Sequence, residues 1–463
     1  MTPLLPQGAE QGWRRPSPRL SLEESHASIP VPQGAGVMRK ALAFAGPGML
    51  VAVGYMDPGN WETDIAGGAR FGYTLLSVIL ISNLTAILLQ HLALKLGVAT
   101  GRDLAQACRD HFSRPVSHGL WILCEVAIAA CDLAEVIGSA IALNLLFDIP
   151  LVAGVLITVL DVMIVLALLH RGFRRLEALV VSLIVIIGGC FAYEIAVSSP
   201  PLAAIARGFV PSSQIVTNPE MLYIAVGILG ATVMPHNLYL HSSIVQTRAY
   251  SRDDAGRRMA IRFGTLDSTV SLLAACFVNA AILIVAAATF RGAEHPESVG
   301  ITEAYHLLSP LLGAAGASTL FALALLCAGQ NATITGTLAG QIVMEGFVNI
   351  RLPAWARRLI TRLIAVVPAA IVAGVAGEGG MKQLLLLSQV VLSLQLSFAV
   401  FPLVMFTSEK AKMGRFVNPW WIKSLAWTAA VAIAALNGWL LVETASGWVG
   451  PLAAQASPEG AGP

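Results

Sequence analysis

Runs of about twenty apolar residues recur along this chain, and they limit its possible folds more strongly than any other feature. A helix of that length crosses the roughly 30 Å hydrocarbon layer of a membrane. Hydrophobic residues make up 56% of the sequence and charged residues only 12%, and a soluble domain of this size cannot bury that much apolar surface. We therefore expect an all-α protein that crosses the cell (inner) membrane many times.

Hydropathy predicts about eleven membrane-spanning helices within a transmembrane domain of residues 41–443. The predicted spans are residues 45–68, 73–96, 119–147, 151–169, 178–196, 222–243, 266–289, 318–343, 359–377, 384–407 and 422–442. Residues 1–40 are polar and rich in Pro, Gly and Ser, which is typical of a disordered tail. Residues 444–463 are predicted to form a second, short tail.

The loops between these spans differ in their content of basic residues. Every second loop contains a group of arginines or lysines, for example Arg174 and Arg175 between the fourth and fifth spans. The intervening loops contain few, among them Arg207 and Arg291. Basic loops stay on the cytoplasmic side of a membrane. The amino terminus is therefore predicted to lie inside and the carboxyl terminus outside, so that the two tails are cytoplasmic and extracytoplasmic respectively.

Charge and cysteine usage argue against several classes of function. A formal charge of +2 gives no support for nucleic-acid binding. The six cysteines show no CxxC spacing, which argues against a disulfide framework or a zinc knuckle. A membrane-embedded metalloenzyme would need a His-rich or HExxH-like run, and the sequence contains none. We therefore expect a protein that is not an enzyme and that binds no cofactor.

The first span contains a stretch that hydrocarbon should reject, Asp57-Pro58-Gly59-Asn60. A carboxylate in the middle of a membrane costs about 2.5–3.5 kcal/mol on insertion scales. Pro58 removes a backbone donor and moves Asp57 away from helical dihedral angles, and Gly59 adds conformational freedom. These residues are expected to open the helix and to free carbonyl oxygens, which are tolerated at that depth only around a cavity or a bound group.

The sixth span repeats this design with Met234-Pro235-His236-Asn237. A single proline in a membrane helix is usually only a kink, and a single membrane methionine usually fills core space. Here the two interruptions occupy corresponding places in two groups of five spans, which is typical of an inverted-repeat transporter with its site at the bilayer midplane. We therefore expect the two broken helices to form one binding site.

The groups at the two breaks suit a divalent transition metal. Asp57 offers a carboxylate, Asn60 offers an amide oxygen, and the break at Pro235 is expected to free the carbonyl of Ala231. Oxygen ligands alone would favour Mg²⁺ or Ca²⁺, but the thioether of Met234 shifts the preference to first-row transition metals. Mn²⁺ or Fe²⁺ is therefore the expected transported substrate.

A third unusual feature is the acid pair Asp132 and Glu135 in the third span. Residues three apart share one face of a helix, and neither carboxylate can stay charged against lipid. A proton relay is the functional interpretation, and structural neutralisation by an Arg or Lys is the alternative. Asp161 is a further membrane acid, in the fourth span, for which the sequence suggests no role beyond a buried hydrogen bond.

The two interrupted motifs together resemble the paired signature of the Nramp family of proton-coupled divalent metal transporters, of the bacterial MntH type. The run from Gly329 to Thr337, followed by Ala339-Gly340-Gln341, is similar to the eighth-helix motif of that family. The small and hydroxyl residues of this run also suit simple helix packing. The resemblance covers residues 41–442, and it implies a LeuT-type inverted repeat of five plus five helices with one extra helix.

The resemblance also implies roles for individual residues. The implied metal ligands are Asp57, Asn60, the Ala231 carbonyl, Met234 and Gln389. Gln389 would approach the metal when the site is closed. Asp132, Glu135 and Arg358 would form the polar proton route. His236 and His241 would line the region below the site, as part of the same proton pathway. Glu62 departs from the family pattern, in which many members carry a small residue, and it would add an acid near the outer vestibule.

We therefore expect a secondary transporter in the lipid bilayer that imports Mn²⁺ or Fe²⁺ together with protons by alternating access. A sodium-coupled amino-acid symporter of the same fold is an alternative, although such sites need no acidic ligand beside a thioether. A Mg²⁺ carrier of related architecture is a second alternative, which the sulfur disfavours, and a channel is a third. The oligomeric state is left open, and no nucleic-acid partner is expected.

Overall fold

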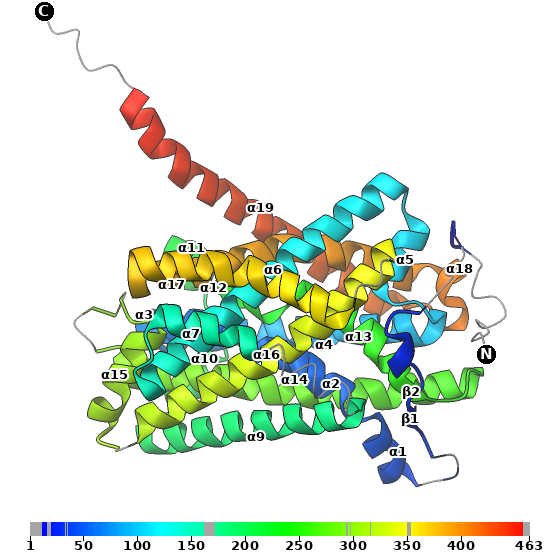
Figure 1. The fold of residues 1–463 in the computed structure, drawn as a ribbon, viewed down its shortest axis with the longest axis horizontal. Helices are drawn as coiled ribbons and strands as arrows, with labels where there is room; N and C mark the ends of the chain where they lie inside the picture. Colours follow the sequence, from blue (N-terminus) through cyan, green and yellow to red (C-terminus); the bar gives the residue numbers. More distant parts are fainter. Residues whose placement is uncertain are drawn as a thin grey trace, which may run out of the picture.

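The computed structural model describes residues 12–15, 20–32, 34, 36–161, 172–292, 295–296, 298–314, 316–349 and 353–456, with side chains for all of these except residues 354, 355, 358 and 443–456. Almost all of the described residues are helical, and most helices lie side by side along the long dimension of the molecule (Figure 1). The bundle therefore has two ends. The end that we name the amino-terminal end carries α5 (Leu104–His111), α18 (Lys410–Met413), β1 (Ile29–Pro30) and β2 (Arg248–Ala249), and the opposite end carries α15 (Ile301–Leu312).

The remaining helices build the bundle between these ends. Those of the first half are α1 (Val37–Phe44), α2 (Pro47–Val53), α3 (Pro58–Phe71), α4 (Leu76–Thr100), α6 (Arg114–Phe147), α7 (Leu151–Ile157), α9 (Phe173–Ser198) and α10 (Leu202–Gly208). Those of the second half are α11 (Gln214–Thr217), α12 (Pro219–Thr232), α13 (Pro235–Ile244), α14 (Asp254–Phe290), α16 (Ala317–Val348), α17 (Ala354–Ser408) and α19 (Trp420–Ala456). Short 3-10 helices are η1 (Glu23–Ser25), η2 (Gly54–Met56), η3 (Gly72–Leu75), η4 (Thr158–Leu160), η5 (Val245–Thr247) and η6 (Gly414–Phe416).

Within the described residues, eight helices are long and apolar enough to cross a membrane, or nine if the bent pair Val37–Phe44 and Pro47–Met56 is one span. Two of the eight, Pro58–Thr100 and Leu359–Ser408, are 43 and 50 residues long. One crossing needs about 20 residues, and each of these two helices contains a glycine with positive φ, Gly72 or Gly377. Both are therefore long enough for two crossings, and the count of eleven spans stays a prediction.

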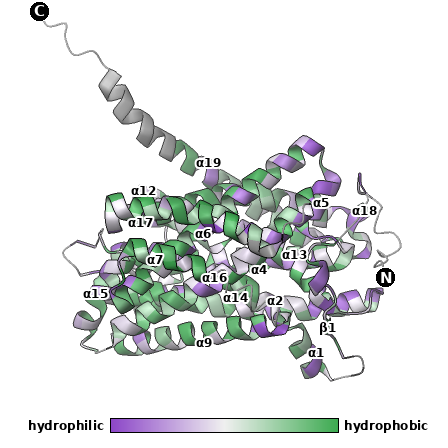
Figure 2. Cartoon of the chain, viewed as in Figure 1, coloured by the Kyte–Doolittle hydropathy of each residue, from purple (hydrophilic) through white to green (hydrophobic). Residues whose placement is uncertain are grey.

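The outer surface of the bundle is apolar. Figure 2 shows hydrophobic residues along the outer helices α7, α9 and α17. Large apolar side chains are exposed at many positions, including Leu266 on α14 and Val375 on α17. Soluble monomers rarely expose contiguous apolar patches of this extent, whereas helices that face lipid do. This surface is that of a multi-pass membrane protein.

The helix packing places both broken helices inside the bundle. Helix α14 packs against α2, α3 and α4, and α6 packs against α16 and α17. Helix α13 contacts α2, α4, α16 and α17. The halves of the first and sixth spans are therefore surrounded by other helices rather than by lipid, as non-helical backbone at membrane depth requires.

Part of the segment before α1 packs against the amino-terminal end of the bundle. The Trp13 ring lies 5.5 Å from the Phe406 ring and 4.9 Å from the Arg102 guanidinium. The Leu22 amide donates to a Glu345 carboxylate oxygen at 2.9 Å, and β1 pairs in parallel with β2. These described residues of the predicted disordered tail have defined contacts because aromatic and backbone groups anchor them. Disorder of the other tail residues stays a prediction.

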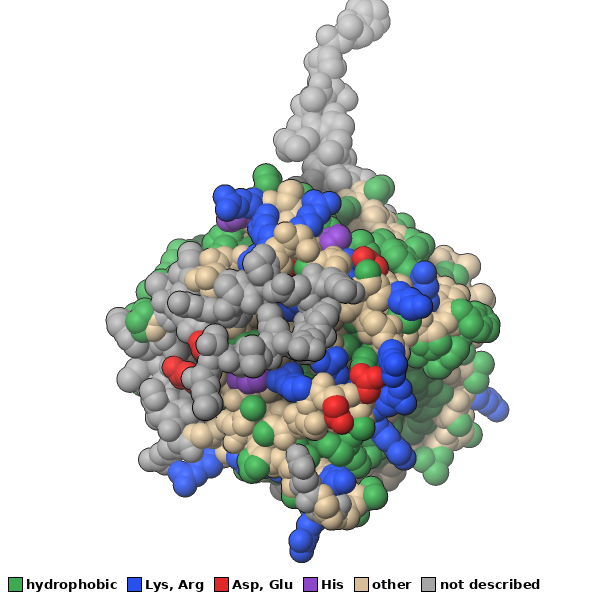
Figure 3. All heavy atoms as spheres, turned by 90° about the vertical axis from the view of Figure 1, so that its right-hand side faces the viewer, with side chains coloured by type: hydrophobic (Ala, Val, Ile, Leu, Met, Phe, Trp, Pro, Cys, Tyr) green, Lys and Arg blue, Asp and Glu red, His purple; other side chains and the backbone are tan. Residues whose placement is uncertain are grey.

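Basic side chains gather at the amino-terminal end. Figure 3 looks onto this end, where Lys and Arg side chains are spread widely and Asp and Glu side chains are sparser. Exposed arginines from three different helices contribute to this end: Arg114 on α6, Arg175 on α9, and Arg258 and Arg262 on α14. The sequence predicted that these loops share one side of the membrane, and the structure brings them to one end. That this end faces the cytoplasm stays a prediction.

Candidate metal site

The first span is broken at Asp57. Helix α2 ends at Val53, η2 covers Gly54–Met56, and α3 begins at Pro58. Asp57 itself is extended (φ −70°, ψ 164°), and its carboxylate accepts the Asn60 backbone amide at 2.9 Å. Proline is favoured at the first position of a helix and Asp at the position before it. The motif therefore ends one helix and starts the next, and the predicted break is confirmed.

The sixth span is broken in the same way. Helix α12 ends at Thr232 and α13 begins at Pro235, while Val233 (φ −98°, ψ 81°) and Met234 (φ −76°, ψ 125°) between them are not helical. The Ala231 carbonyl lies in the last turn of α12. Its usual helical donor would be the amide of Pro235, which has no hydrogen. The second predicted break is confirmed, and it frees the predicted carbonyl.

One side chain from a neighbouring helix and one from the first span itself bind the carbonyls exposed at the first break. The Asn279 amide on α14 donates to the Tyr55 carbonyl at 2.8 Å, and Trp61 Nε1 donates to the Met56 carbonyl at 3.1 Å. An unsatisfied backbone group in hydrocarbon costs several kcal/mol, so these bonds offset much of the cost of interrupting the helix. The surrounding fold therefore supplies partners for the carbonyls that the break exposes.

Three of the predicted metal ligands meet between the two breaks. The Asn60 side-chain amide donates to Asp57 Oδ1 at 2.7 Å and to the Ala231 carbonyl at 3.1 Å. All three residues are buried. The Asp57 and Ala231 oxygens thus both accept from the Asn60 amide nitrogen. A cation bound between these two oxygens would take the place of that nitrogen. Rotation of the Asn60 amide would then present its oxygen as a third ligand.

The other two predicted ligands lie against the first break. A Cβ atom added to Gly54 would lie 3.2 Å from the Met234 sulfur, so the thioether is next to η2. A Cβ atom added to Gly59 would lie only 1.8 Å from Gln389 Nε2, so this position admits Gln389 only because it is a glycine. Gln389 Oε1 and Asp57 Oδ2 are buried and have no hydrogen-bond partner among the described residues. Both oxygens are available to a cation.

The donor set differs from that of a structural metal centre. Within the described part of the chain, no group of three or more His, Cys, Asp or Glu side chains is placed to hold a metal. The break site instead combines one carboxylate with amide and carbonyl oxygens and a thioether. Tight zinc sites use thiolates and imidazoles. A single anionic ligand among neutral ones suits an ion that must be released again.

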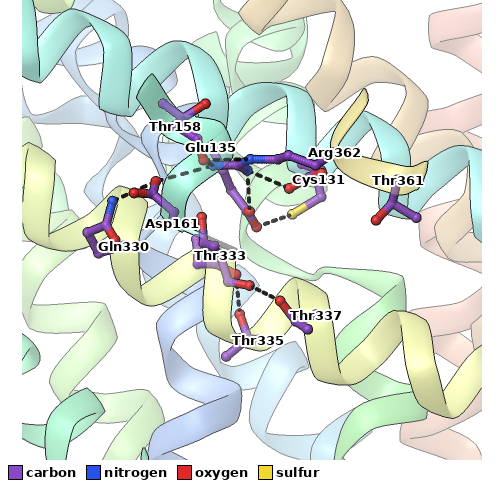
Figure 4. Close-up of polar contacts among 12 residues, drawn as sticks. Cys131, Glu135, Thr158, Asp161, Gln330, Thr333, Thr335, Thr337, Thr361 and Arg362 are labelled. Carbon is purple, nitrogen blue, oxygen red and sulfur yellow. Dashed lines mark hydrogen bonds and ion pairs between the residues drawn. The ribbon is translucent and has the colours of Figure 1, made fainter. Parts of the chain in front are cut away.

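A buried ion pair joins α6 to α17, and Figure 4 shows Arg362 and Glu135 of this contact. Arg362 Nη1 donates to Asp132 Oδ1 at 2.7 Å and lies 3.7 Å from Glu135 Oε2. All three side chains are buried. The positive charge of Arg362 therefore offsets the negative charge of the acid pair. This is the arrangement that the structural alternative to a proton relay predicted. A compensated pair can still exchange protons, so the relay stays a prediction.

Arg362 was not among the residues selected from the sequence. Arg358, the arginine that the resemblance implied, has its side chain outside the described residues, and Arg362 one helical turn later reaches both acids. Arg362 lies within the predicted span 359–377, and an arginine inside a span is costly unless it has a buried partner. That position is the signal that identifies it.

Asp161 belongs to the same network. Its Oδ2 accepts from Gln330 Nε2 at 2.8 Å and lies 3.3 Å from Arg362 Nη2 (Figure 4). Gln330 of the eighth-helix motif therefore makes a specific polar contact. In the same motif, the Thr335 and Thr337 hydroxyls donate to backbone carbonyls of their own helix, which agrees with the packing interpretation for that part of the motif.

The two predicted histidines lie on separate polar paths. His236 Nε2 is 3.8 Å from Cys131 Sγ, which is 3.5 Å from Glu135 Oε1. This path connects the second break to the acid pair through a cysteine that the sequence analysis did not select. His241 Nδ1 is 3.0 Å from Gln90 Oε1 on α4, so His241 contacts α4, whereas His236 contacts Cys131 on α6.

Glu62, the departure from the family pattern, ties α3 to the opposite end of the bundle. Its Oε2 accepts the Ile301 amide at 3.1 Å at the start of α15, and Lys382 Nζ lies 3.6 Å from its Oε1. A helix amino terminus and a lysine both stabilise a carboxylate. The Glu62 charge is therefore compensated at this contact rather than added to the metal site.

Comparison with known sequences gives one consistent family. The model of natural resistance-associated macrophage protein-like proteins, Nramp, matches residues 48–443. The divalent metal cation transporter MntH of Nostoc sp. is 62% identical over 434 residues, which cover 94% of this chain and 98% of the relative. The MntH of Bradyrhizobium diazoefficiens is 60% identical over 437 residues, which cover 94% of this chain and 97% of the relative.

Solved structures give the same result. A manganese transporter of Eremococcus coleocola, crystallised with an aromatic bis-isothiourea substituted compound, is 43% identical with a TM-score of 0.87, over 95% of this chain and 93% of that chain. Mhp1, a nucleobase-cation-symport-1 family transporter in a closed conformation, is 14% identical with a TM-score of 0.57 and shows the fold alone. The predicted LeuT-type inverted repeat is confirmed. With both helix breaks in place and a family model matched over most of its length, the chain belongs to the Nramp family.

Proposed function

We propose that this chain is a secondary transporter that carries Mn²⁺ or Fe²⁺ into the cell through the site between its two broken helices, together with protons. Membership of the Nramp family makes the chain a membrane transporter and not an enzyme. The observation that carries the proposal is the convergence of Asp57 Oδ1 and the Ala231 carbonyl on one buried position. The MntH relatives are named divalent metal cation transporters, and the similar solved structure is that of a manganese transporter.

The ligand set supports a transition metal as the substrate. Asp57 and the neutral oxygens would bind any hard divalent cation. The sulfur of Met234 lies beside the same break, and a thioether adds affinity for Mn²⁺ or Fe²⁺ but little for Ca²⁺ or Mg²⁺. Discrimination against Ca²⁺ and Mg²⁺, which are more abundant, therefore depends on the Met234 side chain. The same sulfur argues against the alternative of a Mg²⁺ carrier.

Transport requires the two ends of the bundle to open in turn. Asp57, Asn60 and Met234 are buried, so an ion reaches them only after one end opens. At the opposite end, the contact of Glu62 with the Ile301 amide ties α3 to α15. We assign the amino-terminal end to the cytoplasm because basic side chains gather there. Entry from outside then begins with separation of α3 from α15.

Protons are proposed to move along the polar path that starts at the second break. His236, Cys131 and Glu135 follow one another at contact distances of 3.8 and 3.5 Å, and Glu135 lies next to Arg362. These groups are buried and lead away from the metal ligands towards α17. The two fluxes would therefore share Asp57 as a common responsive group but follow different routes.

A sodium-coupled amino-acid symporter of the same fold is supported less well. Such a carrier holds the carboxylate of its substrate at the positive amino termini of the half-helices. In this chain the Asp57 carboxylate already caps α3 by accepting the Asn60 amide. An anionic substrate would meet a fixed negative charge at that position, whereas a cation would be attracted to it.

Metal uptake into proteoliposomes with internal pH recording tests the proposal. Asp57→Ala removes the only anionic ligand, so Mn²⁺ uptake should fall to the rate of protein-free liposomes. Asp148→Asn is the matched control, because Asp148 is an exposed acid with φ 55° beyond the end of α6, and asparagine tolerates that conformation. The control should transport normally, and uptake retained in Asp57→Ala would refute the site.

A further inference from the structure

A shallow, open groove lies apart from the helix breaks, between α4 and α14 at the amino-terminal end of the bundle. Its basic lining residues are Lys95 from α4, Arg258 and Arg262 from α14, and Arg415 from η6, with His91 beside them. Among the described residues that line this α4–α14 groove, none is acidic. The groove therefore concentrates positive charge, and low-dielectric walls strengthen the attraction of such a cleft for anions.

Arg258 and Arg262 make no ion pair among the described residues, and Lys95 donates to the amide oxygen of Asn418 at 2.9 Å. Arg258 and Arg262 are one turn apart on α14 and both are exposed. Arg415 pairs with Asp254 at 3.1 Å at the edge of the groove. The fork of donors on a guanidinium matches the oxygens of a phosphate group. The two unpaired guanidinium groups are thus available to an anion of this kind.

The groove lies where the lipid-facing stripe of α14 ends. The face that carries Arg258 and Arg262 continues, at intervals of three or four residues, through Leu266, Val270 and Leu273, which are 53%, 52% and 49% exposed. Towards the amino-terminal end of the bundle, the apolar stripe of α14 is therefore followed by two arginines. A membrane leaflet has the same order, with acyl chains followed by headgroup phosphates.

We propose that the α4–α14 groove binds the headgroup phosphate of an anionic phospholipid, whose acyl chains lie along the apolar stripe of α14. Basic pockets between membrane helices bind headgroups of this kind, and each Lys or Arg near the membrane surface adds about fivefold in affinity. Helix α14 also packs against α2 and α3. The lipid would therefore bind the helix that supports the first break.

Lipid binding to the purified full-length chain in detergent tests the proposal, with native mass spectrometry as the readout. The parent chain should bind dioleoyl-phosphatidylglycerol at least about tenfold more tightly than dioleoyl-phosphatidylcholine. R258Q/R262Q should weaken phosphatidylglycerol binding by about tenfold or more and leave phosphatidylcholine binding unchanged. R258K/R262K keeps both charges and should retain most of the preference.

The matched control is R114Q/R175Q, which removes two exposed arginines from other helices at the same end. It should bind phosphatidylglycerol as the parent does. Three results would each overturn the proposal. They are parent-like binding by R258Q/R262Q, an equal loss of binding in R114Q/R175Q, and displacement of the lipid by millimolar inorganic phosphate. If the double variant does not fold, the single variants R258Q and R262Q should each lose about threefold to fivefold, and parent-like binding by both would overturn it. These measurements need no transport, so their failure leaves the metal site untouched.

Discussion

Met234 is the one non-oxygen ligand among the five proposed for the site. It lies in the non-helical linker between α12 and α13, and its sulfur contacts η2 across the break. The side chain is fully buried and packs with Cys131 and Leu392. Methionine at such a place could be explained as core filling. Its position beside Gly54, on the other broken helix, is what distinguishes a ligand from a filler.

Replacement of this sulfur should change ion selectivity more than transport itself. In Met234→Ala, Mn²⁺ uptake should persist while Ca²⁺ becomes an effective competitor, with the ratio of the Ca²⁺ inhibition constant to the Mn²⁺ KM falling about tenfold or more. Competition assays in proteoliposomes measure this ratio. Met221→Ala removes a buried methionine from the outer half of α12 and should keep the parent ratio. An unchanged ratio in Met234→Ala would remove the sulfur from the explanation of selectivity.

The sequence predicts the structural role of a residue best where that residue acts on its own stretch of backbone. Proline at position 58 or 235 interrupts a helix whatever surrounds it, so both breaks were predicted correctly. That the residues next to them bind a metal stays a prediction. Arg362 illustrates the opposite case. Whether Arg362 reaches Asp132 depends on the rotation of α17 against α6. That rotation is a property of the packed bundle.

Among the elements, the strand β1 and the residues before it connect the tail to the bundle. His26 Nε2 lies 2.8 Å from Arg252 Nη2, and β1 pairs with β2 three residues further on. A guanidinium can donate to this ring only while the ring is neutral. Hydropathy carries no information about such contacts, because they depend on partners more than two hundred residues away. The sequence therefore gave no indication that this segment docks.

Docking of this segment should depend on pH. The pKa of His26 is lowered from 6.5 to about 4, first by burial and second by the Arg252 charge, against a smaller opposing effect of Glu23. A histidine whose pKa is lower in the docked state binds fewer protons there, so docking is strongest above about pH 6.5 and weakens as the pH falls towards 4. Hydrogen exchange at residues 20–32, corrected for its intrinsic pH dependence, should therefore be faster at pH 5 than at pH 7.

The control for this prediction is His26→Gln, which removes the titrating ring and keeps an amide beside Arg252. Its corrected exchange should be nearly independent of pH over the same interval. If the parent chain and His26→Gln responded to pH in the same way, another group would be responsible for any release of the segment.

At the scale of the whole molecule, the structure separates two polar systems. The proposed metal ligands lie at the two helix breaks, and the Arg362 network lies between α6 and α17 with Asp161 and Gln330. His236 and Cys131 connect them. The sequence predicted the class of fold, both helix breaks and the acid pair of the third span, since each depends on particular residues within apolar spans. It did not predict the arginine or the cysteine that contacts this pair, because contacts between helices depend on tertiary packing.

This separation makes a prediction for coupling. Glu135→Gln keeps the size of the side chain and its position next to Cys131 but removes its charge. Proton entry that accompanies Mn²⁺ uptake should fall about tenfold or more, while Mn²⁺ binding to the purified protein should stay within about twofold of the parent. Internal pH recording and metal titration measure the two quantities. Glu220→Gln, at an exposed acid of α12, should leave both unchanged, and equal losses in Glu135→Gln would argue against a separate proton route.

The Asn60 side chain joins the two broken helices to each other. Its amide donates to Asp57 Oδ1 at the start of α3 and to the Ala231 carbonyl at the end of α12. A movement that separates α3 from α12 must therefore break the hydrogen bond between Asn60 and Ala231, so this one side chain fastens the two halves of the molecule at its centre.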